Sequence, residues 1–148
     1  MKSCFFIGHR EAEMLPTLET VVKQHITEYG VTDFFVGNYG HFDWMAAKAV
    51  LHAKTQYPNI TLTLLIPYHP AERPIALPSG FDRSFYPPGM EDVPRRLAIV
   101  RANRYMVNHV EYLIAYAWHP ASNARELVRY AEKISVRSAL KITNLASK

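Results

Sequence analysis

The chain has little of what marks several classes of protein. Its 148 residues include a single cysteine, Cys4, so a disulfide framework and a cysteine-based zinc site are both excluded. No apolar run approaches the roughly eighteen residues of a membrane span, and the N-terminus lacks the long apolar core of a secretory signal. We therefore expect a cytoplasmic protein that makes no membrane contact.

The chain also lacks a large excess of positive or negative charge. Lys and Arg number 17 and Asp and Glu number 13, which gives a net charge of +4 at pH 7. The basic residues are spread from Lys2 to Lys148 and form no stripe, so nucleic acid is not an expected partner. The small positive excess indicates only a weak preference for anions.

Proline and aromatic residues are abundant by comparison, and the prolines are unevenly spread. Seven of the ten prolines lie between Pro67 and Pro94. Because the segment 67–90 has no sustained period, we expect a mostly irregular insertion within one domain that spans residues 1–148. Its aromatic residues either face a partner or cover their own domain: Tyr68, Phe81, Phe85 and Tyr86.

Short apolar runs alternate with segments of helical periodicity along the whole chain. Strands are expected at 3–7, 32–36, 60–66, 111–117 and 139–145. Helices are expected to begin near Pro16, Asp43, Glu91 and Ser122 or Asn123. This alternation predicts an α/β fold, an open and mainly parallel five-stranded sheet with helices on both faces. In such sheets ligands bind beyond the carboxyl ends of the strands, where the strand order reverses.

A short glycine turn, Gly8-His9-Arg10, directly follows the first predicted strand. Glycine allows a ligand phosphate to approach the backbone, and the guanidinium of Arg10 offers a planar fork of donors. The alternative is an ordinary turn at the end of a strand with a solvated arginine.

A second glycine-containing turn runs from Gly37 to Asp43 and leads into a predicted helix. Backbone N–H groups around Gly37, Asn38 and Gly40, together with the helix N-terminus, could hold an anion. Asp43 could instead simply cap that helix. The turn matches neither the dinucleotide fingerprint nor the Walker loop.

Four histidines each follow one of the first four predicted strands and could gather at one rim of the sheet: His9, His41, His69 and His119. None of them has a partner at the spacing of a metal-binding pair, so no metal site is expected. Polar contacts to a ligand are the favoured role.

The only basic cluster consists of Arg95, Arg96, Arg101 and Arg104. At helical spacing Arg101 and Arg104 share a face near Asn103, which fits anion recognition or an ordinary solvated helix face.

Glu126 lies one turn into the last predicted helix, beside the segment 118–123. Its carboxylate could stabilise an oxocarbenium-like centre or act as an acid or base. It could equally pair with Arg129 or Lys133.

The order and spacing of these motifs resemble the YpsA-like branch of the SLOG superfamily, which groups the DprA and Lonely Guy folds. The resemblance covers nearly the whole chain. It is carried by the segments Phe6–Arg10, Val36–Asp43, Tyr57–Ile60, Phe85–Glu91, Pro94–Ile99, Asn103–Val107, Tyr130-Ala131 and Ile142–Leu145.

The resemblance implies a Rossmann-like three-layer domain that senses a nucleotide or a nucleotide-derived ligand and self-associates, at least as a homodimer. Lonely Guy relatives hydrolyse the N-glycosidic bond of nucleoside 5′-monophosphates with an arginine and a glutamate, for which Glu126, Arg101 and Arg104 are the candidates here. Their glycine-rich catalytic loop is replaced by Ser122-Asn123-Ala124, which favours binding over hydrolysis. No cofactor beyond a phosphate-containing ligand is expected. The expected ligand-binding residues are Gly8, His9, Arg10, Gly37, Asn38, Gly40, Asp43, Asn103, Ser122 and Asn123.

Overall fold

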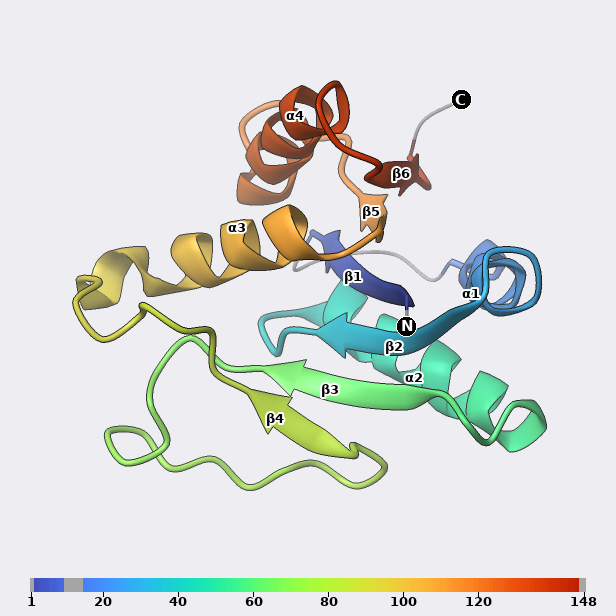
Figure 1. The fold of residues 1–148 in the computed structure, drawn as a ribbon, viewed down its shortest axis with the longest axis horizontal. Coiled ribbons are helices and arrows are strands. Elements are labelled where there is room, and N and C mark those ends of the chain that lie inside the picture. The colour runs from blue at the N-terminus through green and yellow to red at the C-terminus, as the bar shows by residue number, and fades with distance from the viewer. Residues whose placement is uncertain (1, 10–14, 147–148) are drawn as a thin grey trace.

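A computed structural model describes residues 2–9 and 15–146 of the chain. One sheet contains β1 (Lys2–Gly8), β2 (Val31–Val36), β3 (Thr61–Leu65), β4 (Arg83–Phe85), β5 (Tyr112–Tyr116) and β6 (Lys141–Asn144). The strand order is β4-β3-β2-β1-β5-β6 and every pairing is parallel (Figure 1). The prediction of an open parallel α/β sheet is confirmed, with six strands in place of five.

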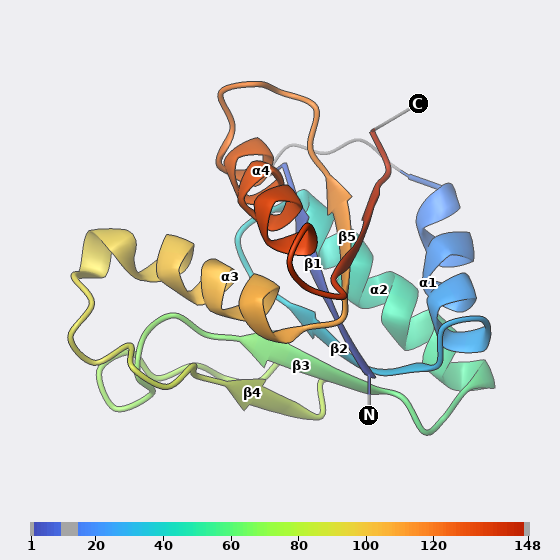
Figure 2. The ribbon, with the colours of Figure 1, turned by 45° about the horizontal axis from the view of Figure 1, so that its top comes forward.

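Helices cover both faces of this sheet. They are α1 (Thr17–Thr27), α2 (His41–Gln56), α3 (Ala98–His109) and α4 (Asn123–Ser135), with a short 3₁₀ turn at Arg95–Leu97 before α3. The first two pack on one face and the last two on the other (Figure 2), so the architecture has three layers, as Rossmann-like folds do. Within the described residues, every helix is too short or too polar to cross a membrane.

The sequence of β1 explains why both faces are covered. Four consecutive residues, Cys4 to Ile7, are buried. Cys4 and Phe6 pack into the core beneath α1 and α2, while Phe5 and Ile7 pack into the core beneath α3 and α4. Burial also raises the pKa of the Cys4 thiol far above its ordinary value, so this cysteine is an inert core residue.

The segment 67–90 is mostly irregular, as expected, with one short regular element that was not expected. Residues 83–85 form β4, an edge strand that pairs with β3. Asp82 anchors it, because its backbone N–H donates to the carbonyl of Leu62 and its carboxylate accepts from the Leu62 N–H and the Lys54 ammonium. The residues that these bonds join are far apart in the sequence, and the three-residue strand contains no apolar run from which the strand could be predicted.

The aromatic residues of the insertion pack onto their own domain. Phe81 contacts the core beneath α1 and α2, and Tyr68, Phe85 and Tyr86 contact the core beneath α3 and α4. Of the two roles considered for these aromatic residues, the contacts support the covering of their own domain. Residues 71–80 by contrast are all exposed.

Three predicted boundaries shift. The helix expected from Glu91 begins only at Ala98, because Pro94 is extended and residues 95–97 form the 3₁₀ turn. The helix expected to begin at Asp43 starts two residues earlier, at His41, with Gly40 before it. The last strand is confined to residues 141–144 at the sheet edge.

The strand order reverses at β1. Strands β2, β3 and β4 follow one another on one side of β1, whereas β5 and β6 lie on its other side. The helices that follow β1 and β5 in the sequence, α1 and α4, therefore lie on opposite faces of the sheet, and the reversal between these strands is where open α/β sheets bind ligands.

A buried histidine lies on the far side of the molecule from that point. His25 is fully buried, its Nδ1 donates to the carbonyl oxygen of Val21 at 2.8 Å, and its ring packs edge-on against Tyr29 and Tyr112. Its Nε2 has no hydrogen-bond partner among the described residues. Burial lowers the pKa of His25 below its ordinary value of 6.5. The hydrogen bond to Val21 raises this pKa, whereas the charge of Lys141 lowers it further.

The variant His25→Phe should make the protein less sensitive to acid. The folded state lowers the pKa of His25, so the unfolded chain binds the proton more readily. The free energy of unfolding therefore decreases as the pH falls below 6.5. Urea unfolding at about pH 7.5 and about pH 5 should show a larger loss of unfolding free energy in the wild type than in the variant. Equal losses would contradict this role of His25.

Candidate functional site

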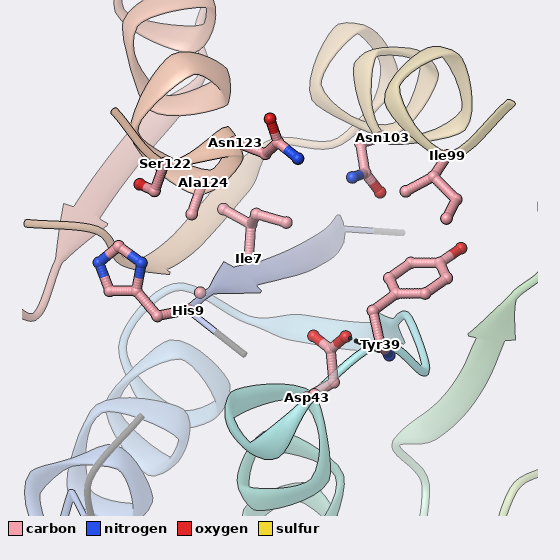
Figure 3. A pocket seen from close by; sticks show the side chains of 11 residues that line it. Ile7, His9, Tyr39, Asp43, Ile99, Asn103, Ser122, Asn123 and Ala124 are labelled. Carbon is pink, nitrogen blue, oxygen red and sulfur yellow. Dashed lines mark hydrogen bonds between the residues drawn. The ribbon is translucent and has the colours of Figure 1, made fainter. Parts of the chain in front are cut away.

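A pocket of about 230 Å³ lies at the point where the strand order reverses (Figure 3). We call it the switch-point pocket. It is lined by Ile7, Gly8, His9, Tyr39, Gly40, Asp43, Ile99, Asn103, Ser122, Asn123 and Ala124. These residues come from the end of β1, the turn before α2, the buried side of α3 and the start of α4. Three of the segments expected at the carboxyl ends of the strands contribute to this lining, at residues 8–9, 37–43 and 118–123, whereas the insertion at 67–90 contributes no residue to it.

Gly8 ends β1 and lines the pocket. A Cβ atom at this position would overlap the ring of Phe42, which is fully buried at the start of α2. Glycine is therefore required for the close packing of β1 against α2. This packing role is separate from the approach of a phosphate that the motif suggested.

His9 follows Gly8 and bridges two loops. Its Nε2 accepts hydrogen bonds from the backbone N–H groups of Trp118 at 3.0 Å and of His119 at 3.3 Å. An imidazole nitrogen that accepts carries no proton, so His9 is the neutral tautomer with its proton on Nδ1. Burial, and then the charge of His119, lower the pKa of His9 below its ordinary value of 6.5.

The turn before α2 supplies the acidic side of the pocket. Asp43 is buried in the first helical turn, and its Oδ2 accepts from the backbone N–H of Tyr39 at 3.0 Å. Asp43 thus supports the helix start from inside the first turn, although it is not the N-cap residue. Gly37 leaves room for this arrangement, since a Cβ there would lie 2.6 Å from the Tyr39 ring.

The start of α4 supplies the donor side. Ser122 caps the helix, because its Oγ accepts from the backbone N–H of Arg125 at 3.0 Å. The prediction that Ser122 or Asn123 caps this helix is therefore confirmed for Ser122. The N–H groups of Asn123 and Ala124, next to the pocket, have no hydrogen-bond partner within the described part of the chain.

Asn103 projects from α3 into the pocket between these two sides (Figure 3). It is 8% exposed, and its Oδ1 is fully buried without a hydrogen-bond partner among residues 2–9 and 15–146. An unsatisfied buried polar group costs about 1–3 kcal/mol. A polar atom that lies unpaired in the wall of a pocket is what a ligand donor would satisfy.

Several predicted site residues lie elsewhere. Arg10 is outside the described residues. Gly37 and the exposed Asn38 stand next to the pocket but do not line it. The three candidate catalytic residues are exposed on their helices and are absent from the pocket lining: Arg101, Arg104 and Glu126. The guanidinium of Arg104 instead lies 4.7 Å from the centre of the Tyr130 ring.

The four histidines do not meet at one rim. His9 and His119 come together, whereas His41 stacks on Trp44 and His69 packs edge-on against Tyr86 in a separate hollow. Among the described residues, no group of three or more His, Cys, Asp or Glu side chains could hold a metal ion.

Sequence reasoning missed four lining residues, Ile7, Tyr39, Ile99 and Ala124. It also missed a repeated motif, in which an aromatic residue is followed by His-Pro-Ala after β3 (68–71) and again after β5 (118–121). In both, the histidine Nδ1 accepts from the alanine N–H, at 3.0 Å for His69 and 3.2 Å for His119. This repeat is the one sequence signal that could have predicted the shape of the loop after β5.

The pocket is electrostatically divided. Two helix N-termini meet at it, but the one at α2 already holds the Asp43 carboxylate, whereas the one at α4 presents uncharged donors. No described lining residue is a lysine or an arginine. Among the described lining residues, the uncharged donors at α4 therefore favour an anionic group, whereas the carboxylate at α2 fits hydroxyl or amino donors.

The variant Gly8→Ala should destabilise the fold by about 1–3 kcal/mol, as overpacking of a tight core contact does. Urea denaturation measures the loss. The matched test is a double-mutant cycle with Phe42→Ala, which removes most of the ring that the new methyl group meets. The double variant should lose less than the sum of the single losses, by about 1 kcal/mol or more. A Gly8→Ala chain as stable as the wild type would contradict the packing role.

No protein-family model matches the chain, and no curated protein matches it either. The resemblance to the YpsA-like branch of the SLOG superfamily therefore stays a prediction. What supports a functional proposal is the geometry of the switch-point pocket.

Proposed function

We propose that the protein binds a small phosphorylated molecule of the nucleoside monophosphate type in the switch-point pocket, with the phosphate at the N-terminus of α4. The observation that carries this proposal is the buried Asn103 oxygen, which faces the pocket without a partner among the described residues. The unpaired acceptor raises the free energy of the ligand-free protein, and a hydrogen-bond donor on a ligand would remove this cost.

The phosphate end follows from the start of α4. Backbone N–H groups at the first turn of a helix, combined with the positive end of the helix dipole, form an anion site without any charged side chain. Asn123 and Ala124 present these groups, and the Ser122 cap holds them in place. Arg10 follows His9 directly in the sequence and is the nearest candidate for a fixed positive charge.

The other end follows from Asp43 and Asn103. A buried carboxylate and an amide oxygen are both acceptors, so they fit donors such as the hydroxyl groups of a ribose. The volume of about 230 Å³ is below the range of about 300–1,000 Å³ that encloses a whole drug-sized ligand. The pocket thus suits the sugar and phosphate of a nucleotide, with the base outside.

The proposal is one of binding and sensing. The glutamate predicted for glycosidic hydrolysis, Glu126, is exposed and does not line the pocket, and the carboxylate that does line it, Asp43, accepts from the Tyr39 N–H at the start of α2. The cytoplasmic location, the self-association and the membership of the YpsA-like branch belong to the same proposal and rest on the resemblance and on composition.

Isothermal titration calorimetry with adenosine 5′-monophosphate tests the phosphate end. The monophosphate should bind at least about tenfold more tightly than adenosine, which corresponds to about 1.4 kcal/mol from the helix N-terminus and its donors. Chromatography of the same mixture should return the monophosphate intact. Equal affinities for the two compounds, or no heat at millimolar concentration, would count against the proposal.

The variant Asn103→Leu tests the buried oxygen, with two opposite effects expected. The unfolding free energy should rise by about 1 kcal/mol or more, because an unsatisfied acceptor is removed from a buried position. The affinity for the monophosphate should fall at least about tenfold. The matched control is Asn59→Leu, an exposed position in the turn before β3 and outside the pocket lining, which should change neither quantity. A destabilised Asn103→Leu chain with normal affinity would show that Asn103 is only structural.

A further inference from the structure

One imidazole nitrogen ties together two loops that lie about 110 residues apart in the sequence. The donors to His9 Nε2, at Trp118 and His119, belong to the loop that connects β5 to α4. Both bonds meet a single acceptor atom, so one protonation event removes both of them.

Hydrogen bonds connect the β5–α4 loop to the residues that line the pocket. The carbonyl oxygen of His119 accepts from Ser122 Oγ at 2.8 Å and from the Ser122 N–H at 3.2 Å. Ser122 in turn caps α4 through the Arg125 N–H. A short chain of hydrogen bonds therefore runs from His9 through residues 118–119 to the residues that present the anion-binding end of the pocket.

We propose that His9 is a positioning residue for ligand binding, which holds the β5–α4 loop when neutral and releases it when protonated. This inference rests on the proposed function for its effect on affinity. Protonation places a hydrogen on Nε2, where the lone pair accepts at present. The new N–H then faces two backbone N–H groups, so both hydrogen bonds are replaced by repulsion.

The direction of the pH dependence follows from the surroundings of His9. Tyr116 of β5 lies edge-on at 5.7 Å between ring centres, His119 comes from the loop, and Asp43 of α2 lines the same pocket. Burial and the charge of His119 hold the pKa of His9 below 6.5. The loop is therefore held at neutral pH and released as the pH falls through this lowered pKa.

The fluorescence of Trp118 tests the release without any ligand. Its indole lies 5.1 Å from the His9 ring between centres, and Trp44 is the only other tryptophan. In a Trp44→Phe background, acid should quench Trp118 in a transition below about pH 6.5, because a protonated imidazole quenches a nearby indole. The His119 ring also lies 5.6 Å from the Trp118 ring between centres, so the decisive comparison carries His119→Gln in both chains. In that comparison the transition should vanish with His9→Gln, whose side chain accepts at a similar reach but does not titrate. With His119→Gln it should persist and move to higher pH.

A transition that His9→Gln leaves unchanged would overturn the proposal. NMR of the imidazole nitrogens in the wild type decides the same question if the variant does not fold. A proton on Nε2 at neutral pH would overturn the assignment, and a proton on Nδ1 supports it.

Calorimetry with adenosine 5′-monophosphate tests the effect on binding. Between about pH 8 and about pH 5.5, the wild type should lose at least about fivefold more affinity than His9→Gln, a typical coupling between two sites. The phosphate of the ligand also takes up a proton near pH 6, but it does so equally in both titrations. The variant His9→Phe, without an acceptor, should bind weakly at both pH values. The matched control His69→Gln alters the equivalent turn after β3 and should behave as the wild type.

The possible failures are distinguishable. Absence of monophosphate binding at pH 8 would refute the proposed function, while the Trp118 transition would still decide the role of His9. Binding with equal pH dependence in the wild type and His9→Gln would refute the positioning role and leave the proposed function intact.

Discussion

Burial of β1 on both of its faces is the constraint on which the rest of the structure depends. A central parallel strand cannot leave either face in water, so its alternate residues require two separate cores and two layers of helices. The same strand is paired on both edges, with β2 and with β5. The helices α1 and α4, which follow β1 and β5, lie on opposite faces, and the pocket opens at the carboxyl ends of these two strands.

Backbone N–H groups are the main hydrogen-bond donors described at this pocket. The proposed anion-binding end consists of N–H groups at the start of α4, and the loop in front of it is held by bonds from N–H groups to His9. Side chains contribute two buried acceptors, Asp43 and Asn103. A site of this kind leaves little trace in composition, which is why the net charge of the chain says so little about its ligand.

The sequence predicts the layers of the fold because each apolar run is as long as a buried strand and each helix has a clear period. It does not predict β4, whose pairing depends on bonds from Asp82 to Leu62 and Lys54. At the site, topology alone brings Gly8, Asp43 and Ser122 together. Helix geometry explains why Asn103 lines the pocket while its neighbours do not: successive residues turn by about 100°, so Arg101 and Arg104 point to other sides.

The division of the pocket between α2 and α4 limits what can enter it. A molecule with anionic groups at both ends would place one of them beside the buried Asp43 carboxylate, where like charges repel. A molecule without any anion would leave the donors of Asn123 and Ala124 unused. In the proposed site, selection therefore depends on how unevenly charge is distributed along a molecule, and only secondarily on its size.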